Sequence, residues 1–206
     1  MEYQQRLDAL AAVWERWAEV GGALTDVEWS TPSRCAGWDV AALFAHVGLF
    51  PQAVLDPPHA DGGDPVTAVD ILRGFNAPGR FAHTMADQVA DGTVAVAAQV
   101  GGSGLVALFA DTGPRGIAAL RERPADGLVP WPAAAAVTTW SEAVRIVLLE
   151  STVHLLDVLD GLGRAPHLPP SALREAAHLL AELADPVAFV DAATGRALES
   201  PLPVLR

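Results

Sequence analysis

Apolar side chains recur every three or four residues along most of the chain, which is the spacing of one buried face of an α-helix. The stretches that show this spacing are, in order, 3–22, the segment after Asp39, 65–91, 105–123, 139–161 and 171–184. Alanine is abundant and strand-forming aromatic residues are few. Because alanine favours helices, the pattern predicts an all-α fold.

Proline and glycine mark the expected breaks between these helices. Pro78-Gly79 is expected to kink or split the helix over 65–91, and Pro114 is expected to kink or break the one over 105–123. The stretch 92–102 shows no clear pattern, and 124–132 reads as extended. No linker or repeat is evident, so we expect a single domain over 1–206, with a core bundle at about 3–163 and a C-terminal helix and tail at about 164–206.

Composition and charge restrict the classes of partner. The net charge of −12 argues against a nucleic-acid partner, which needs a basic surface. We expect no apolar stretch long enough to span a bilayer and no signal peptide at the N-terminus, so the predicted location is cytoplasmic. The single cysteine, Cys35, excludes an internal disulfide, and we interpret it as a structural residue.

Polar side chains interrupt the apolar run at 148–158 at three positions. A step of four residues turns an α-helix by about 400°, so Glu150 and His154 lie on one stripe, and Asp157 falls on the same stripe. Apolar neighbours surround them on the helix. A carboxylate and an imidazole are therefore expected to point inward, where a polar group without a partner is costly.

A third candidate ligand comes from an earlier helix. His46 shares a face with Leu43, Val47 and Phe50, so it is also expected to point inward. Two imidazoles and one carboxylate form a ligand set suited to zinc, and three protein ligands leave an open position, as in catalytic sites. The alternative is that these side chains form only a buried hydrogen-bonded network.

Three segments together resemble a known family. They are Cys35-Ala36-Gly37-Trp38-Asp39-Val40 leading to Ala45-His46-Val47, then Glu150-x-x-x-His154-x-x-Asp157, and finally the ending from Pro186-Val187 to Gly195-Arg196. They resemble actinobacterial members of the DinB-like, mycothiol-dependent maleylpyruvate isomerase family. The resemblance covers nearly the whole chain, and its motifs are more specific together than apart.

The resemblance implies a DinB-like four-helix bundle with extra short helices and a short extended C-terminal tail. It implies one divalent metal ion, expected to be zinc, held by His46, Glu150 and His154, and the thiol cofactor mycothiol. Asp157 would orient the ligands. The candidate catalytic residues are Asp157 and Arg80, and the candidates for contacting the cofactor are Trp38 and Thr152.

The activity implied is that of a mycothiol-dependent isomerase or S-transferase acting on a small electrophilic substrate, in a monomer or homodimer. Two alternatives remain from the residues: a DinB-like hydrolase or transferase that uses metal-bound water, and a non-enzymatic metal-binding interaction module. The loops 51–65 and 92–132 carry no motif matching maleylpyruvate binding. We also expect little room for the separate C-terminal domain of the isomerase.

Overall fold

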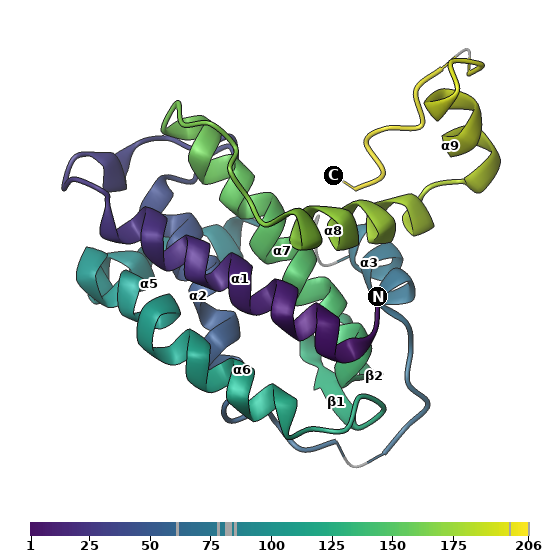
Figure 1. The fold of residues 1–206 in the computed structure, drawn as a ribbon, viewed down its shortest axis with the longest axis horizontal. Coiled ribbons are helices and arrows are strands. Elements are labelled where there is room, and N and C mark those ends of the chain that lie inside the picture. Colours follow the sequence, from purple (N-terminus) through teal and green to yellow (C-terminus); the bar gives the residue numbers. More distant parts are fainter. Residues whose placement is uncertain (61, 78, 81–83, 85, 198, 206) are drawn as a thin grey trace.

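Four helices form a bundle that contains the main core. The computed structural model of the protein describes all residues except 61, 78, 81–83, 85, 198 and 206, and omits the side chains of 86 and 87. The four helices are α1 (Tyr3–Gly22), α2 (Val40–Ala53), α5 (Ala86–Ala107) and α7 (Trp140–Gly161). α1 packs against α7 and α5, and α2 packs against the same two helices (Figure 1). The predicted four-helix bundle is confirmed.

Aromatic side chains fill the centre of this bundle. Trp17 on α1 stacks on Phe109 at a centroid distance of 5.1 Å and meets Phe44 of α2 edge-on at 4.6 Å. Its indole N–H donates to the carbonyl of Ser151 on α7 at 2.8 Å, and that of Trp14 donates to the Ser151 hydroxyl at 3.1 Å. The two tryptophans therefore fix α1 to the middle of α7.

A second, smaller apolar cluster lies on another side of α7. It joins α3 (Ala68–Asn76) and α8 (Pro170–Leu183) to Ile146 and Leu149. The helix predicted over 65–91 is therefore split: a Thr67–Asp70 capping box starts α3, and Gly79 takes a φ of +73° before α5. Pro78, Phe81 and Met85 of the predicted helix lie outside the described residues.

The segment after α5 continues with little interruption. α5 contains a break at Gly101, where φ is +70°, and is followed by a π-helical turn, η2 (Leu108–Thr112), and by α6 (Gly113–Arg121). Pro114 has no N–H to donate, and it lies at the start of α6, directly after that turn. The stretch 92–102, which shows no clear pattern in the sequence, is helical except at the break at Gly101.

One stretch in the described part of the chain, Gln88–Arg121, is long and apolar enough to cross a membrane by length and composition alone. This contradicts the expectation that no stretch reaches that length. About a quarter of its most apolar window is buried in the fold (28%), and Ala97, Leu105 and Phe109 belong to the main core.

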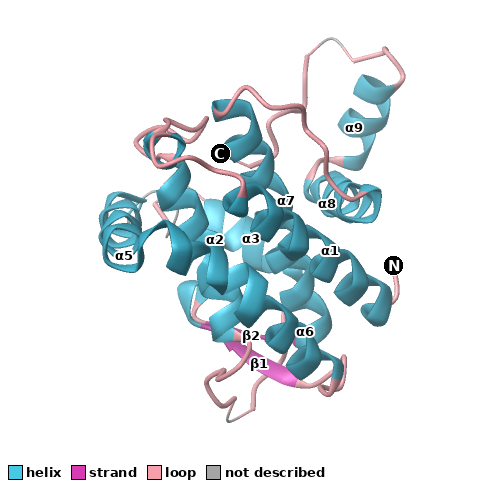
Figure 2. Cartoon of the chain, turned by 60° about the vertical axis from the view of Figure 1, so that its left-hand side comes forward, coloured by secondary structure: helices cyan, strands magenta, loops and turns pink. Residues whose placement is uncertain are grey.

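A β-hairpin lies at one end of the bundle (Figure 2). β1 (Leu128–Trp131) pairs antiparallel with β2 (Ala136–Thr139), and a 3-10 turn, η3 (Pro132–Ala134), connects them. The predicted extended segment is confirmed at β1, whereas β2 was not predicted. Where β2 ends, the Thr139 hydroxyl accepts the N–H of Glu142 at 3.3 Å and caps α7.

Thr139 and Glu142 have the Thr-x-x-Glu spacing of a capping box, but only the Thr139 half of that box is formed. The Glu142 carboxylate accepts the backbone N–H of Ala68 at 2.8 Å and contacts Arg145 at 3.3 Å. The Glu142 carboxylate therefore binds the distant backbone N–H of Ala68 instead of the N–H of Thr139, which a capping box would require.

Two short helices complete the described elements: a 3-10 turn, η1 (Glu28–Ser30), and α9 (Pro186–Ala193). α9 stands apart from the bundle beyond α8, and none of its residues is buried (Figures 1 and 2). It was not predicted, although the Asp185 cap and Pro186 at its first turn are start signals.

The end of α7 packs closely on the loop before α2. A Cβ at Gly161 would lie 2.6 Å from the Pro32 carbonyl oxygen and 3.1 Å from Ser33 Cα. We expect Gly161→Ala to lower the free energy of unfolding by about 1–3 kcal/mol, because backbone atoms cannot move aside cheaply. The control is Gly22→Ala at the end of α1, where a Cβ meets nothing within 4 Å. Urea unfolding of both variants with equal midpoints would contradict the prediction.

Candidate metal centre

The loop before α2 is held in a fixed shape by its own backbone. The N–H of Trp38 donates to the Cys35 carbonyl at 3.0 Å, and Gly37 between them takes a φ of +82°, which favours glycine. The Trp38 carbonyl accepts both the N–H and the hydroxyl of Ser33. Asp39 then caps α2 by accepting the N–H of Ala42 at 2.8 Å. This loop therefore projects its side chains toward α7 from a constrained position.

Facing positions on α2 and α7 bring the three predicted ligands together. Glu150 Oε2 lies 3.7 Å from His46 Nε2 and 3.3 Å from His154 Nε2. One ligand atom from each residue lies within 4.8 Å of the others, close enough to hold one metal ion. The sequence predicted that these side chains point into the core. Their side chains are 19–29% exposed, so they lie at the edge of the core instead.

Asp157, Cys35 and Arg34 orient His154 from the opposite side of its ring. Its Nδ1 lies 3.0 Å from Asp157 Oδ2, and Asp157 Oδ1 receives Arg34 Nη2 at 3.0 Å. The thiol of Cys35 donates to Asp157 Oδ2 at 3.2 Å and lies 3.8 Å from His154 Nδ1. A carboxylate only accepts hydrogen bonds, so the proton of Nδ1 points to Asp157 and Nε2 faces Glu150 and His46.

The charges in this cluster are strongly coupled. Burial disfavours ionisation of Glu150, but the hydrogen bonds and charges of His154 and His46 outweigh it and lower its pKa to about 2. Burial likewise disfavours a charged His154, but Asp157, Cys35 and Glu150 outweigh it and raise its pKa to about 11. The cluster therefore favours positive charge between its carboxylates, and a metal ion would replace the extra proton on His154.

Two groups of side chains around His154 have the composition of a metal site. One is His46, Glu150 and His154, and the other is Cys35, His154 and Asp157. A metal ion bound by the second group would have to break the hydrogen bond between His154 Nδ1 and Asp157. The Arg34 guanidinium also already forms an ion pair with Asp157. A cation there would face like charge. The geometry therefore favours the first group, with the Asp157 carboxylate accepting the Nδ1–H of His154 and so orienting its ring.

Comparison with known proteins identifies the family of this chain. Residues 10–159 match the family described as the mycothiol maleylpyruvate isomerase N-terminal domain. The chain belongs to this family. The resemblance drawn from the sequence is thus confirmed, and the match includes the segments that carry all three predicted ligands.

Two solved structures share the fold of this chain. The crystal structure of the mycothiol-dependent maleylpyruvate isomerase aligns with a TM-score of 0.59 at 17% identity, over 92% of this chain and 72% of that one. A variant of that enzyme with one histidine changed to alanine aligns over the same shares, with a TM-score of 0.59 at 16% identity. At these identities the matches show the shared fold alone. The comparison with curated proteins gives no match.

The remaining predicted residues of this family member lie in different places. Trp38 joins the cluster: its ring meets His46 edge-on at 5.0 Å and stacks on His154 at 6.4 Å. Thr152 is buried on the opposite side of α7 from Glu150 and His154, since two residues turn a helix by about 200°, and its hydroxyl donates to the Leu148 carbonyl.

Arg80 is exposed in the segment between α3 and α5. Within the described part of the chain, no hydrogen bond or ion pair links its side chain to the cluster. Its predicted catalytic role gains no support from this position.

Sequence reasoning missed two residues of the cluster, Arg34 and Cys35. Both belong to the loop whose motif was recognised, but Cys35 was interpreted as structural because no base follows it nearby in the sequence. The structure brings Asp157 and His154 to it from more than a hundred residues away. The Cys-x-Gly-Trp turn was the available signal, because a constrained turn presents its side chains in fixed directions.

Proposed function

We propose that this protein is a zinc-dependent enzyme that uses a low-molecular-weight thiol, mycothiol, as an isomerase or S-transferase on a small electrophilic substrate. The observation that carries the proposal is the convergence of His46, Glu150 and His154 within 4.8 Å in a member of this family. Family membership supports the choice of thiol, and the open edge of the cluster supports access for small molecules.

The residues present fit a zinc ion. Two imidazole nitrogens and one carboxylate oxygen are the usual donors of catalytic zinc, which keeps a further position for water or substrate. His46 and His154 would bind through Nε2 and Glu150 through Oε2. Asp157 would hold His154 in the required tautomer, so we assign it a positioning role, with Arg34 keeping its carboxylate in place.

Bound zinc would supply the charge that lowers the pKa of a thiol at the open position. In the proposed reaction the thiol loses its proton to water, and its sulfur bonds to one carbon of a conjugated double bond. The electron pair of that bond moves onto the adjoining carbonyl oxygen. Rotation about the new single bond and loss of the sulfur return the double bond with opposite geometry. If the carbon chain takes up a proton instead, the product is a thioether.

The choice between the two groups of ligands can be tested with one residue from each. We expect His46→Ala to weaken zinc binding at least about tenfold, since even outer-shell changes cost about 10–100-fold. Cys35→Ser should keep nearly the affinity of the natural protein. Competition with a chromogenic chelator measures both. Loss of zinc from Cys35→Ser alone would place the ion with Cys35, Asp157 and His154.

The thiol can be tested without knowing the substrate. We expect mycothiol to bind the zinc-loaded protein saturably in calorimetric titration, and to bind far more weakly after zinc removal by a chelator. The control is the same molecule with its sulfur methylated, which cannot lose a proton. Equal binding of both molecules would contradict a role for the thiol sulfur and would favour chemistry at metal-bound water.

A further inference from the structure

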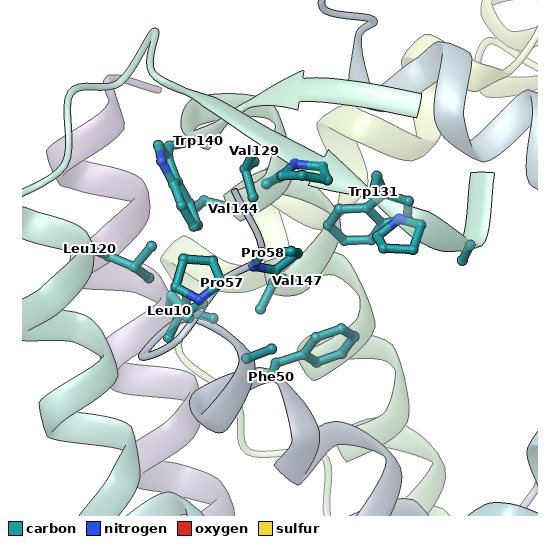
Figure 3. A pocket seen from close by; sticks show the side chains of 16 residues that line it. Leu10, Phe50, Pro57, Pro58, Leu120, Val129, Trp131, Trp140, Val144 and Val147 are labelled. Atoms are coloured by element: carbon teal, nitrogen blue, oxygen red, sulfur yellow. The ribbon is translucent and has the colours of Figure 1, made fainter. Parts of the chain in front are cut away.

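An apolar cavity of about 310 Å³ lies under the β-hairpin, beside the helices that carry the candidate ligands. Figure 3 shows side chains from α1, α2, α6, α7, the hairpin and the loop after α2 converging on it. All sixteen lining residues are leucine, valine, alanine, proline, phenylalanine or tryptophan. The indole N–H groups of Trp131 and Trp140 are the only polar side-chain atoms that these residues possess.

The cavity continues two helix faces that carry the metal ligands. Phe50 lines it, and the Phe50 ring lies 6.2 Å from the ring of His46, one turn earlier on α2. On α7, Val147 lines it and Glu150 follows three residues later on the same face. One helical turn rises about 5.4 Å. A small molecule with its reactive atoms beside the ligands therefore has its remaining atoms next to this cavity.

The lining determines what can enter. A carboxylate in this cavity would lose its water and meet no cation among the lining residues, which is costly. An apolar group loses nothing by entering, and an apolar cavity of about 150 Å³ is already known to take up benzene. The available space is thus sufficient for a substituted aromatic ring or a short alkyl chain.

Arg123 contacts two of the residues that line the cavity. The Arg123 guanidinium lies 4.5 Å from the ring centre of Trp140 and donates to the Val54 carbonyl at 3.1 Å. Trp140 and Val54 both line the cavity. This contact fixes the positions of two lining residues, so the cavity has a defined wall from which a flat apolar group can be recognised.

We propose that this cavity is the subsite for an uncharged apolar group, an aromatic ring or alkyl chain, carried by the electrophilic substrate. That the substrate also carries an electrophilic group rests on the proposed function. That it carries an apolar group rests on the cavity alone. It makes Trp131, Trp140 and Phe50 the residues that determine specificity. It also predicts that dicarboxylic acids are poor ligands for this chain.

The test uses an uncharged fluorescent probe, N-phenyl-1-naphthylamine, and the zinc-treated protein. We expect saturable binding at about one probe per chain. Ala133→Trp, which adds an indole ring to a residue that lines the cavity, should weaken probe binding at least tenfold. The matched control is Ala95→Trp on the exposed side of α5, which should bind as the natural protein does. Naphthalene-2,6-dicarboxylate should not displace the probe, whereas naphthalene should.

Either of two results would overturn the proposal: equal probe affinity in the two tryptophan variants, or displacement by the dicarboxylate as effective as by naphthalene. His154→Ala separates it from the proposed function, because the probe needs no metal and should bind this variant unchanged. In His154→Ala, loss of zinc and thiol binding with probe binding intact is the expected result. If the natural protein itself binds the probe but neither zinc nor the thiol, the proposed function is refuted and the cavity is supported. Zinc and thiol binding without any saturable probe binding would refute the cavity alone.

Discussion

Replacing His154 by alanine is expected to remove bound zinc, lowering zinc affinity at least about 100-fold, because the loss of a ligand exceeds the outer-shell effect of about 10–100-fold. His154 belongs to both groups of candidate ligands, so among the residues that the structure describes no other set of three remains to hold the ion. Elemental analysis of the purified variant, after dialysis against zinc, gives the metal content. Thiol-dependent binding should disappear with the metal.

The matched control is His178→Ala, which removes an exposed histidine on α8. It should keep the metal content of the natural protein. Circular dichroism should show equal helicity in both variants, since His154 lies at the edge of the core. A His154→Ala protein that retains about one zinc per chain at equal helicity would refute the metal centre.

Trp17→Ala is expected to have the largest effect on stability, lowering the free energy of unfolding by about 3–5 kcal/mol. Its side chain is completely buried, and the change removes the stacking on Phe109, the edge contact with Phe44 and the hydrogen bond to Ser151. Guanidinium unfolding followed by circular dichroism measures the loss.

Trp17→Phe separates the packing from the hydrogen bond, because it keeps an aromatic ring and loses the N–H. We expect a smaller loss than for alanine. Val94→Ala, at a position 47% exposed on α5, should change stability little. If Trp17→Ala unfolds at the same denaturant concentration as Val94→Ala, the contacts between α1 and α7 do not hold the bundle together.

The helices that the sequence predicted well have either one apolar face or a clear start. α1 and α8 show the apolar face, whereas α2 and α7 begin at the capping side chains of Asp39 and Thr139. The sequence gives no clear prediction over 92–102, where Ala, Gly and Val predominate on all faces, so periodicity cannot distinguish a buried side from an exposed one. β2 was missed because its pairing with β1 depends on the turn between them. Ala135 in this turn has a φ of +49°, a conformation that an alanine in the sequence does not indicate.

The candidate site was predicted as far as helix geometry reaches. His46, Glu150 and His154 could be identified because each lies on an apolar helix stripe where polar residues are unexpected. Arg34 could not be found in this way, since it meets Asp157 through a loop and not through a repeating pattern. Conversely, Thr152 is close to the ligands in sequence, but the helix turns it to the opposite side.

The β-hairpin continues directly into α7, the helix that carries Glu150 and His154, because Thr139 both ends β2 and caps α7. The strand β1 provides cavity wall at Val129, Pro130 and Trp131, whereas the ligands begin three turns further along α7. Point mutations at the tip of the hairpin can therefore change which molecules are admitted without moving a ligand. Such separation allows a lineage to acquire new substrates by small genetic steps while it inherits the reactive centre intact.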